Sequence, residues 1–75
     1  MRSSLLIQVN GEPREVAENI SLPELIAELS LKAEQIAIEL NHSVIRRARW
    51  EKTLLQADDK VEIVHFVGGG SRQTA

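Results

Sequence analysis

The sequence contains no cysteine, and this absence removes disulfides, thiolate metal sites and a cysteine nucleophile together. Aromatic residues are also scarce, at 3% of the chain. No apolar run approaches the roughly 20 residues that cross a bilayer, and no signal-peptide pattern opens the sequence. These absences predict a cytoplasmic protein with no membrane partner.

Catalytic signals are missing as well. A chain of 75 residues allows one domain with a thin core and little room for an internal active site. Its net charge of −2 argues against nucleic acid as the main partner. His42 and His65 have no carboxylate or second histidine at ligand spacing, so we expect no metal site. Asp58 and Asp59 are adjacent acids of the kind found in solvated turns. The sequence therefore does not predict an enzyme.

Alternating apolar residues predict strands at 5–9, 12–17, 36–40 and 61–67. Asn10-Gly11 lies between the first two strands, and this dipeptide favours a tight type I′ hairpin. Pro13 lacks an N–H group, so the second strand is expected to lie at a sheet edge or to begin irregularly. Residues 41–43 predict a turn, followed by no more than a minor strand.

One helix is predicted between the hairpin and the third strand. Ser21 and Glu24 have the spacing of a capping box, and Pro23 is compatible with a first helical turn. The helix is expected to end near Ser30. Its apolar stripe should pack against the strands, and the predicted core contains Leu22, Leu25, Ile26, Leu29, Ile7, Val9, Ile36, Ile38, Val61 and Ile63.

Residues 46–60 predict a long irregular connection. Leu54 and Leu55 are expected to attach it to the core, and Trp50 to anchor it. The arginines of this segment form a basic cluster that comprises Arg46, Arg47 and Arg49. A solvated loop is the favoured interpretation of this cluster, and a docking site for an acidic partner is the alternative.

The element order predicts an α+β fold in two layers, with one main helix on one face of a mixed sheet of four to five strands. The first and last strands should lie side by side at its centre. This is the β-grasp, or ubiquitin-like, fold. We expect the β-grasp domain to cover residues 1–67 and a flexible C-terminal tail to cover 68–75.

Three short stretches then resemble one family. "DKVEIVHFVGGG" at 59–70 is the most specific, and "VNGE" at 9–12 and "ELN" at 39–41 are weaker. Over about residues 7–70 the chain resembles the ThiS family, the sulfur carriers of thiamine thiazole biosynthesis. The family normally ends at its glycines, whereas this chain continues through residues 71–75.

The resemblance implies a function for the tail formed by Gly68, Gly69 and Gly70. In the family, an adenylating (ThiF-like) enzyme uses ATP to activate the carboxylate of the last glycine, here Gly70 or Gly69. A persulfide enzyme supplies sulfur, and the resulting thiocarboxylate delivers it to thiazole synthase (ThiG-like). Glycine suits this task because it has no Cβ to block a nucleophile. The carrier itself would bind no cofactor and would be a monomer.

Docking is expected at Val64 and Phe66, which share the outward face of the last strand. The alternative is that the connection at 46–55 covers them. Residues 71–75 leave Gly70 without a free carboxylate, so the full chain is expected to be an inactive precursor that a peptidase trims. The alternative is that the extension is never removed and the protein serves simple binding. Other interpretations stay open: a carrier for molybdopterin, cysteine or methionine synthesis, or a non-covalent β-grasp interaction module.

Overall fold

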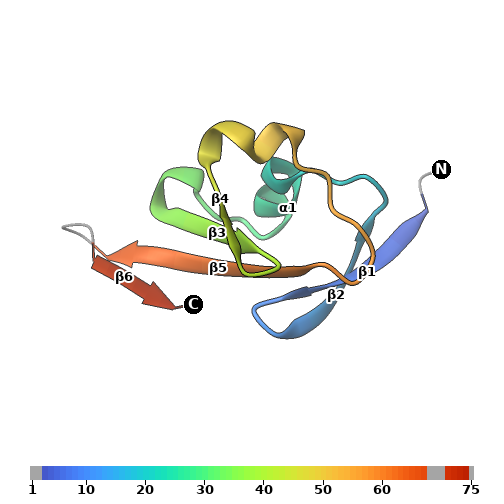
Figure 1. The fold of residues 1–75 in the computed structure, drawn as a ribbon, viewed down its shortest axis with the longest axis horizontal. Helices are drawn as coiled ribbons and strands as arrows, with labels where there is room; N and C mark the ends of the chain where they lie inside the picture. The colour runs from blue at the N-terminus through green and yellow to red at the C-terminus, as the bar shows by residue number, and fades with distance from the viewer. Residues whose placement is uncertain (1–2, 68–70, 75) are drawn as a thin grey trace.

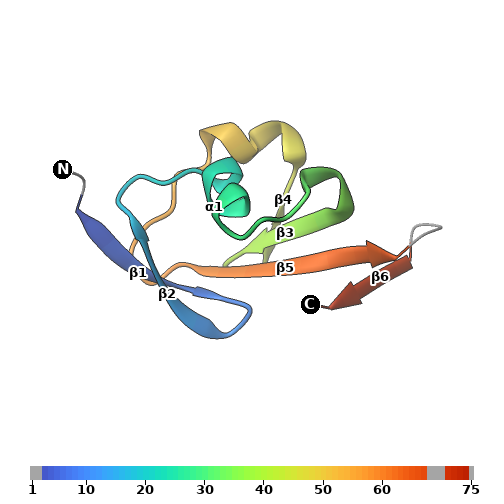
Figure 2. The same ribbon diagram turned by 180° about the vertical axis from the view of Figure 1, so that it is seen from behind.

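The computed structural model describes residues 3–67 and 71–74. Its strands are β1 (Ser4–Val9), β2 (Glu12–Ala17), β3 (Ile36–Leu40), β4 (Ser43–Ile45), β5 (Lys60–Val67) and β6 (Ser71–Thr74). The helix α1 (Leu22–Glu28) is joined by the 3-10 helices η1 (Ala33–Gln35) and η2 (Arg47–Lys52). Both α1 and η2 lie over the same face of the sheet (Figures 1 and 2). The fold therefore has the two layers that the element order predicts.

The sheet has the strand order β2-β1-β5-β3-β4, and β6 pairs with β5 off this path. β1 and β5 are parallel neighbours at its centre, whereas β2 pairs with β1, and β3 with both β4 and β5, in antiparallel fashion. The mixed β-grasp sheet with one main helix is thereby confirmed. β2 has β1 as its neighbour in this order and lies at the edge, as Pro13 predicts.

The β1–β2 and β3–β4 hairpins each close through a turn whose two central residues have positive φ. In the first turn φ is 51° at Asn10 and 83° at Gly11, which confirms the predicted type I′ geometry. In the second turn φ is 51° at Asn41 and 71° at His42. Asparagine tolerates this backbone region better than most residues. Both turns thus begin at an asparagine, which leaves its side chain available for other contacts.

The ends of α1 are satisfied by local hydrogen bonds. The Glu24 N–H donates to Ser21 Oγ at 3.4 Å, and the Ser21 N–H donates to Glu24 Oε1 at 3.0 Å, which confirms the capping box. At the other end, Ser30 has a φ of 59°. The Leu31 N–H donates to the Ile26 carbonyl and the Ser30 N–H to the Ala27 carbonyl, each at 3.1 Å, which is the Schellman pattern. Ser30 occupies the position where glycine is usual.

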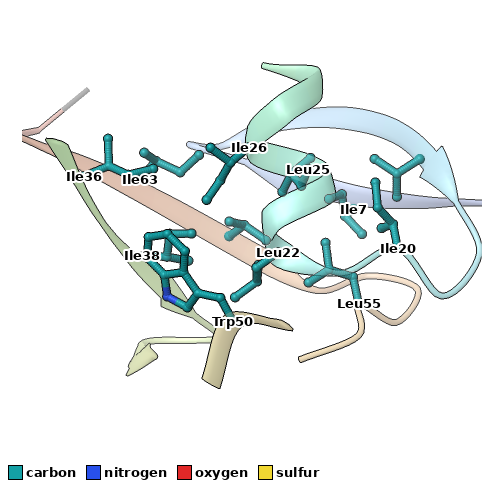
Figure 3. Packing of buried hydrophobic residues seen from close by; sticks show 12 residues of the cluster. Ile7, Ile20, Leu22, Leu25, Ile26, Ile36, Ile38, Trp50, Leu55 and Ile63 are labelled. Carbon is teal, nitrogen blue, oxygen red and sulfur yellow. The ribbon is translucent and has the colours of Figure 1, made fainter. Parts of the chain in front are cut away.

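The core lies between α1 and the sheet (Figure 3). Its buried members include the predicted Ile7, Leu22, Leu25, Ile26, Ile36, Ile38, Val61 and Ile63. Val9 and Leu29 pack against this core but are only partly buried. Val16, Ile20, Trp50 and Leu55 are buried as well. In a domain this small these additional side chains are a substantial share of the apolar interior.

The connection between β4 and β5 is more ordered than the sequence predicts. It contains η2, and Trp50 is 4% exposed with its Nε1 donating to the Ile45 carbonyl at 2.9 Å. Trp50 is therefore confirmed as the anchor. Leu55 is buried, but Leu54 is 46% exposed, so the prediction that both attach to the core is wrong for Leu54. Successive side chains of extended backbone point in opposite directions, and only one of the two leucines can face inward.

The end of the chain also differs from expectation. Ser71–Thr74 form β6, where an unstructured extension is predicted. The difference has a physical reason: part of one edge of β5 is not paired with β1, and an unpaired strand edge accepts another strand. The predicted tail glycines at 68–70, together with residue 75, lie outside the described residues. The domain boundary after residue 67 stays a prediction.

Candidate functional site

The far end of β5 leads directly into the glycine tail. Along this strand Val61 and Ile63 are buried against the helix layer, with exposures of 1% and 2%. Period-2 alternation sends Glu62, Val64 and Phe66 to the opposite face. Val64 is half-buried, and Phe66 is 41% exposed. Two apolar side chains therefore stand on the outer face of the sheet, within a few residues of the tail.

The outer face near Phe66 is not covered by the connection that follows β4. In both ribbon views η2 lies on the helix side of the sheet, over α1 (Figures 1 and 2). The alternative in which residues 46–55 fold over Val64 and Phe66 is therefore wrong. In the ladder between β3 and β5, Ala37 is the partner of Val64, which adds a small apolar residue to this surface. We call Ala37, Val64 and Phe66 the outer apolar patch.

An acidic pair adjoins the outer apolar patch. Glu39 of β3 and Glu62 of β5 are direct partners in the antiparallel ladder. Like charges that lie directly opposite each other on one sheet face destabilise the pairing. The sequence places each glutamate on the outward face but contains no signal that they meet, because the β3–β5 register depends on non-local pairing. Sequence reasoning missed this feature of the surface.

The other end of β5 is held by the two turn asparagines. The Ile63 N–H donates to Asn10 Oδ1 at 2.7 Å, and the Asn10 N–H donates to the Val61 carbonyl at 2.8 Å. On the opposite side, the Lys60 N–H donates to Asn41 Oδ1 at 2.9 Å, and the Asn41 N–H donates to the Lys60 carbonyl at 2.8 Å. We call these contacts the asparagine clamp.

The clamp also fixes the turn that precedes β5. Asn41 Nδ2 donates to Asp59 Oδ1 at 3.0 Å, and the Gln56 N–H donates to Asp59 Oδ2 at 2.8 Å. Asp58 next to it has a φ of 68°. The Asp58-Asp59 pair therefore has a structural role in positioning the start of β5. Both asparagines fall within the "VNGE" and "ELN" stretches, whose structural role is to hold this strand.

The basic cluster lies on the helix side of the molecule, away from the outer apolar patch. Arg46, Arg47 and Arg49 are exposed. Arg47 Nη2 lies 3.6 Å from Glu34 Oε2, and its Cζ lies 6.0 Å from the centroid of the Trp50 ring. The same arginine borders a shallow hollow of about 380 Å³ lined by Pro23, Ala33, Arg47, Ala48, Trp50 and Glu51. The basic cluster and the outer apolar patch thus lie on opposite sides of the sheet.

His42 and His65 are also far apart in the fold. His42 occupies the β3–β4 turn, and His65 lies in β5 opposite Ile36. Among residues 3–67 and 71–74, no three or more His, Cys, Asp or Glu side chains form a group that could hold a metal ion. Within the same part of the chain, no helix is long and apolar enough to span a membrane.

The family of the chain follows from comparison with known proteins. The model of the ThiS family matches residues 7–70. The chain belongs to the ThiS family. Among its relatives is the sulfur carrier protein ThiS of Bacillus subtilis, which is 32% identical over 66 residues that cover 87% of this chain and 100% of that protein. ThiS proteins are sulfur carriers, and this is the family-level description of the chain.

A crystal structure supports the same ThiS assignment for the fold. The thiamine biosynthesis protein ThiS from Geobacter metallireducens superposes with a TM-score of 0.78 at 36% identity, covering 88% of this chain and 100% of that one. Its likeness confirms the β-grasp architecture. The ThiS match in the sequence ends at Gly70, so residues 71–75 lie beyond it.

Two further relatives differ in how much of their own length this ThiS chain spans. A thiazole synthase of Magnetococcus marinus is 38% identical over 69 residues, which are 92% of this chain but 21% of that protein. The chain therefore spans about a fifth of that relative. The uncharacterized protein ycf40 of Porphyra purpurea is 39% identical over 70 residues, 93% of this chain and 99% of that one.

Proposed function

We propose that this chain carries sulfur for thiamine thiazole biosynthesis as a thiocarboxylate on its terminal glycine. The carboxylate of Gly70 attacks the α-phosphate of ATP on a ThiF-like adenylating enzyme, and pyrophosphate leaves. The outer sulfur of an enzyme persulfide then attacks the acyl adenylate and displaces AMP, and a thiol reduces the resulting acyl disulfide to the thiocarboxylate. The chain is a cosubstrate in this scheme rather than an enzyme, and it binds no cofactor of its own.

The match to the ThiS family through Gly70 is the observation that carries the proposal. The glycines follow β5, the strand that the asparagine clamp holds at its start. A tail attached to a fixed strand can be presented to an enzyme while the domain stays folded. Glycine leaves the carbonyl open to attack because it lacks a Cβ atom. Gly69 is the alternative reactive residue if trimming removes one residue more.

Thiazole synthase is the proposed receiver of the sulfur. The Magnetococcus relative that is named thiazole synthase contains a region similar to nearly the whole of this chain. In that relative, a carrier-like region and a protein named thiazole synthase form one polypeptide. This supports the proposal that a separate carrier and a separate thiazole synthase act together. We therefore expect the thiocarboxylate form of this chain to donate sulfur to a ThiG-like enzyme.

Docking to the adenylating enzyme is assigned to the outer apolar patch. Phe66 is 41% exposed, and aromatic side chains are frequent anchors at interfaces. Val64 adjoins it on the same face of β5. The acidic pair Glu39 and Glu62 lies next to the patch and adds negative charge. A partner with an apolar pocket bordered by basic residues would complement this surface.

The extension determines how the proposal is tested. While Ser71 is attached, the carbonyl of Gly70 belongs to an amide, which cannot attack ATP as a carboxylate does. Residues 1–75 and residues 1–70 would each be mixed with ATP and a cognate adenylating enzyme, and pyrophosphate release would be measured. We expect release from the shorter chain only, because a peptidase must first expose Gly70.

Mass spectrometry of the recovered proteins is the control for this experiment. It verifies that the longer chain was not trimmed during the assay, and it detects the thiocarboxylate as one oxygen replaced by sulfur. Equal pyrophosphate release from an intact 75-residue chain would contradict the assignment of the Gly70 carboxylate. An absence of release from both chains would contradict sulfur transfer by adenylation.

A further inference from the structure

One edge of β5 changes its partner halfway along the strand. β1 pairs with β5 at Lys60 and Val61, and then turns away at Asn10. The Asn10 side chain accepts the N–H of Ile63, two residues farther along β5. Beyond this contact, β1 does not pair with β5. The edge of β5 from Val64 to Val67 is therefore open to another strand, and we call it the open edge.

β6 occupies the open edge. It pairs antiparallel with β5, so that Thr74 lies opposite Val64, Gln73 opposite His65, Arg72 opposite Phe66 and Ser71 opposite Val67. Val64 and His65 also pair with Ala37 and Ile36 of β3 on their other side. A strand has only two edges, so β6 must lie on the same side as β1. Figure 1 shows β6 beside β5 on the side away from β3.

The hydrogen-bonding groups of the open edge can be assigned by alternation. The Val61 carbonyl and the Ile63 N–H point toward β1, since they bond with Asn10. Main-chain groups of a strand alternate between its two edges with period 2. The N–H and C=O groups of His65 and Val67 therefore point toward β6. In an antiparallel ladder, their hydrogen-bonded partners are Gln73 and Ser71.

This pairing is of a kind that can be displaced. β6 has four residues, and its sequence, Ser-Arg-Gln-Thr, contains no large apolar residue. An added strand this short buries little apolar surface, so little holds it beyond its main-chain pairing with β5. Strand addition to an exposed edge is also a common way in which proteins recognise extended segments, with main-chain bonds supplying the affinity.

We infer that the open edge of β5 is a strand-docking surface for the adenylating enzyme, and that β6 occupies it as a blocking segment in the uncut chain. The inference builds on the proposed function, because it concerns the enzyme that the proposal names. It adds a second effect of the extension. Residues 71–75 mask the Gly70 carboxylate, and β6 separately prevents an extended segment of the enzyme from pairing with His65 and Val67.

Amide hydrogen exchange tests the blocking segment without any enzyme. In residues 1–75 the His65 and Val67 amides should exchange more slowly than in residues 1–70. Gln73→Pro should remove this protection, because it deletes an N–H that points toward β5. Arg72→Pro is the matched control, since the N–H of Arg72 points away from β5 and its loss should leave His65 protected. Equal exchange in residues 1–75 and residues 1–70 would refute the pairing.

The effect on the enzyme is tested with a chain whose carboxylate is free while its edge is covered. The sequence has no cysteine, so His65→Cys in residues 1–70 creates one unique thiol. A synthetic peptide of residues 71–75 that carries Gln73→Cys is joined to it by a disulfide. Hydrogen-bonded strand pairs have Cα atoms about 5.5 Å apart, which suits a disulfide. A control peptide is methylated on the nitrogen of residue 73 and cannot complete the ladder.

We expect the tethered peptide to slow pyrophosphate release at least about tenfold relative to the methylated control, because tethering gives millimolar effective concentrations. Reduction of the disulfide should restore the rate. Equal rates for the two tethered forms would overturn the blocking role, even though residues 1–70 are adenylated. No adenylation of unmodified residues 1–70 would instead contradict the proposed function, and hydrogen exchange would still decide whether β6 occupies the edge.

Discussion

The two halves of β5 are held by different kinds of partner. The first half, from Lys60 to Ile63, lies between the β1–β2 and β3–β4 hairpins. The asparagine clamp adds hydrogen bonds from Asn10 on one edge and from Asn41 on the other. The second half keeps β3 on one edge as far as His65, but its other edge is paired with β6, a segment that lies beyond the residues matched by the ThiS family model. One half is held on both edges by strands within the ThiS match, and the other is paired on one edge with a segment outside it.

This difference explains how a rigid domain can present a tail. Hydrogen bonds to both edges and burial of Val61 and Ile63 define the direction in which β5 leaves the core. The second half can then exchange one edge partner for another without disturbing the core. Under the proposed function, the reactive glycine follows the end of the strand where few internal contacts would have to be broken.

The difference between the two halves of β5 disappears if the hydrophobic core is lost. Leu25 is 0% exposed, and Leu25→Ala should destabilise the domain by about 2–5 kcal/mol, a large part of the stability of a small protein. Both halves of β5 would then exchange at the same rate. Urea unfolding followed by Trp50 fluorescence measures the loss. Leu6→Ala is the control, because Leu6 is 54% exposed and its truncation should cost no more than about 0.5 kcal/mol. Equal losses would contradict the assigned core.

The clamp can be weakened without altering the turn. Asn10→Gly keeps the positive φ but removes the acceptor for the Ile63 N–H, and it should cost about 1–3 kcal/mol because a buried donor loses its partner. The Ile63 amide should exchange faster than in the unaltered chain. Asn10→Asp retains a side-chain oxygen at this position and is the matched control. If both variants retain full stability, the contact at 2.7 Å does not hold β5.

A substitution in the second half of β5 should affect binding to the adenylating enzyme more than the stability of the fold. Phe66→Ala should change the free energy of unfolding by less than about 1 kcal/mol, since Phe66 is partly exposed, yet raise the KM of the adenylating enzyme for residues 1–70 about tenfold. Val44→Ala serves as its control, because Val44 is 64% exposed on β4, which does not pair with β5. An unchanged KM for Phe66→Ala would remove the outer apolar patch from docking.

The smallest effect is expected at the boundary between the two halves. Glu62→Gln removes the like-charge pairing with Glu39 and should raise stability by about 0.2–1 kcal/mol at low salt. Added salt should shrink the gain, because it screens exposed charges. Thermal unfolding at two ionic strengths measures both. Lys60→Gln is the control, because Lys60 lies two residues earlier on the same face of β5. A loss of stability in Glu62→Gln would show that the pair is favourable as it stands.

Local rules predicted most of the fold from the sequence. The Asn10-Gly11 turn, the Ser21 capping box and the position of Pro13 at an edge each depend on residues that are neighbours in the chain. The central pairing of the first and last strands came from the element order. Features that depend on contacts between distant segments were missed: the Glu39–Glu62 register, and the contact of the Asn10 side chain with Ile63.

Features of the candidate site that depend on local pattern were likewise predicted, and those that depend on distant contacts were not. Alternation along β5 was enough to place Val64 and Phe66 on the outward face, and the structure agrees. The 3-10 helix η2 was not predicted, because Arg47–Lys52 has no helical apolar period and is held through Trp50. β6 was not predicted because Ser-Arg-Gln-Thr has no strand pattern, and its pairing depends on where β1 leaves β5.

The central position of β5 has a consequence for how the protein is made. The β1–β2 and β3–β4 hairpins are both translated before β5. They join into one sheet only through β5, because β5 lies between β1 and β3. Neither hairpin alone can bury its apolar face, and closing the sheet requires bringing together segments distant in sequence. We expect the two hairpins to form early and to remain unjoined on the nascent chain. The rate of folding would then be set by the insertion of β5 between them.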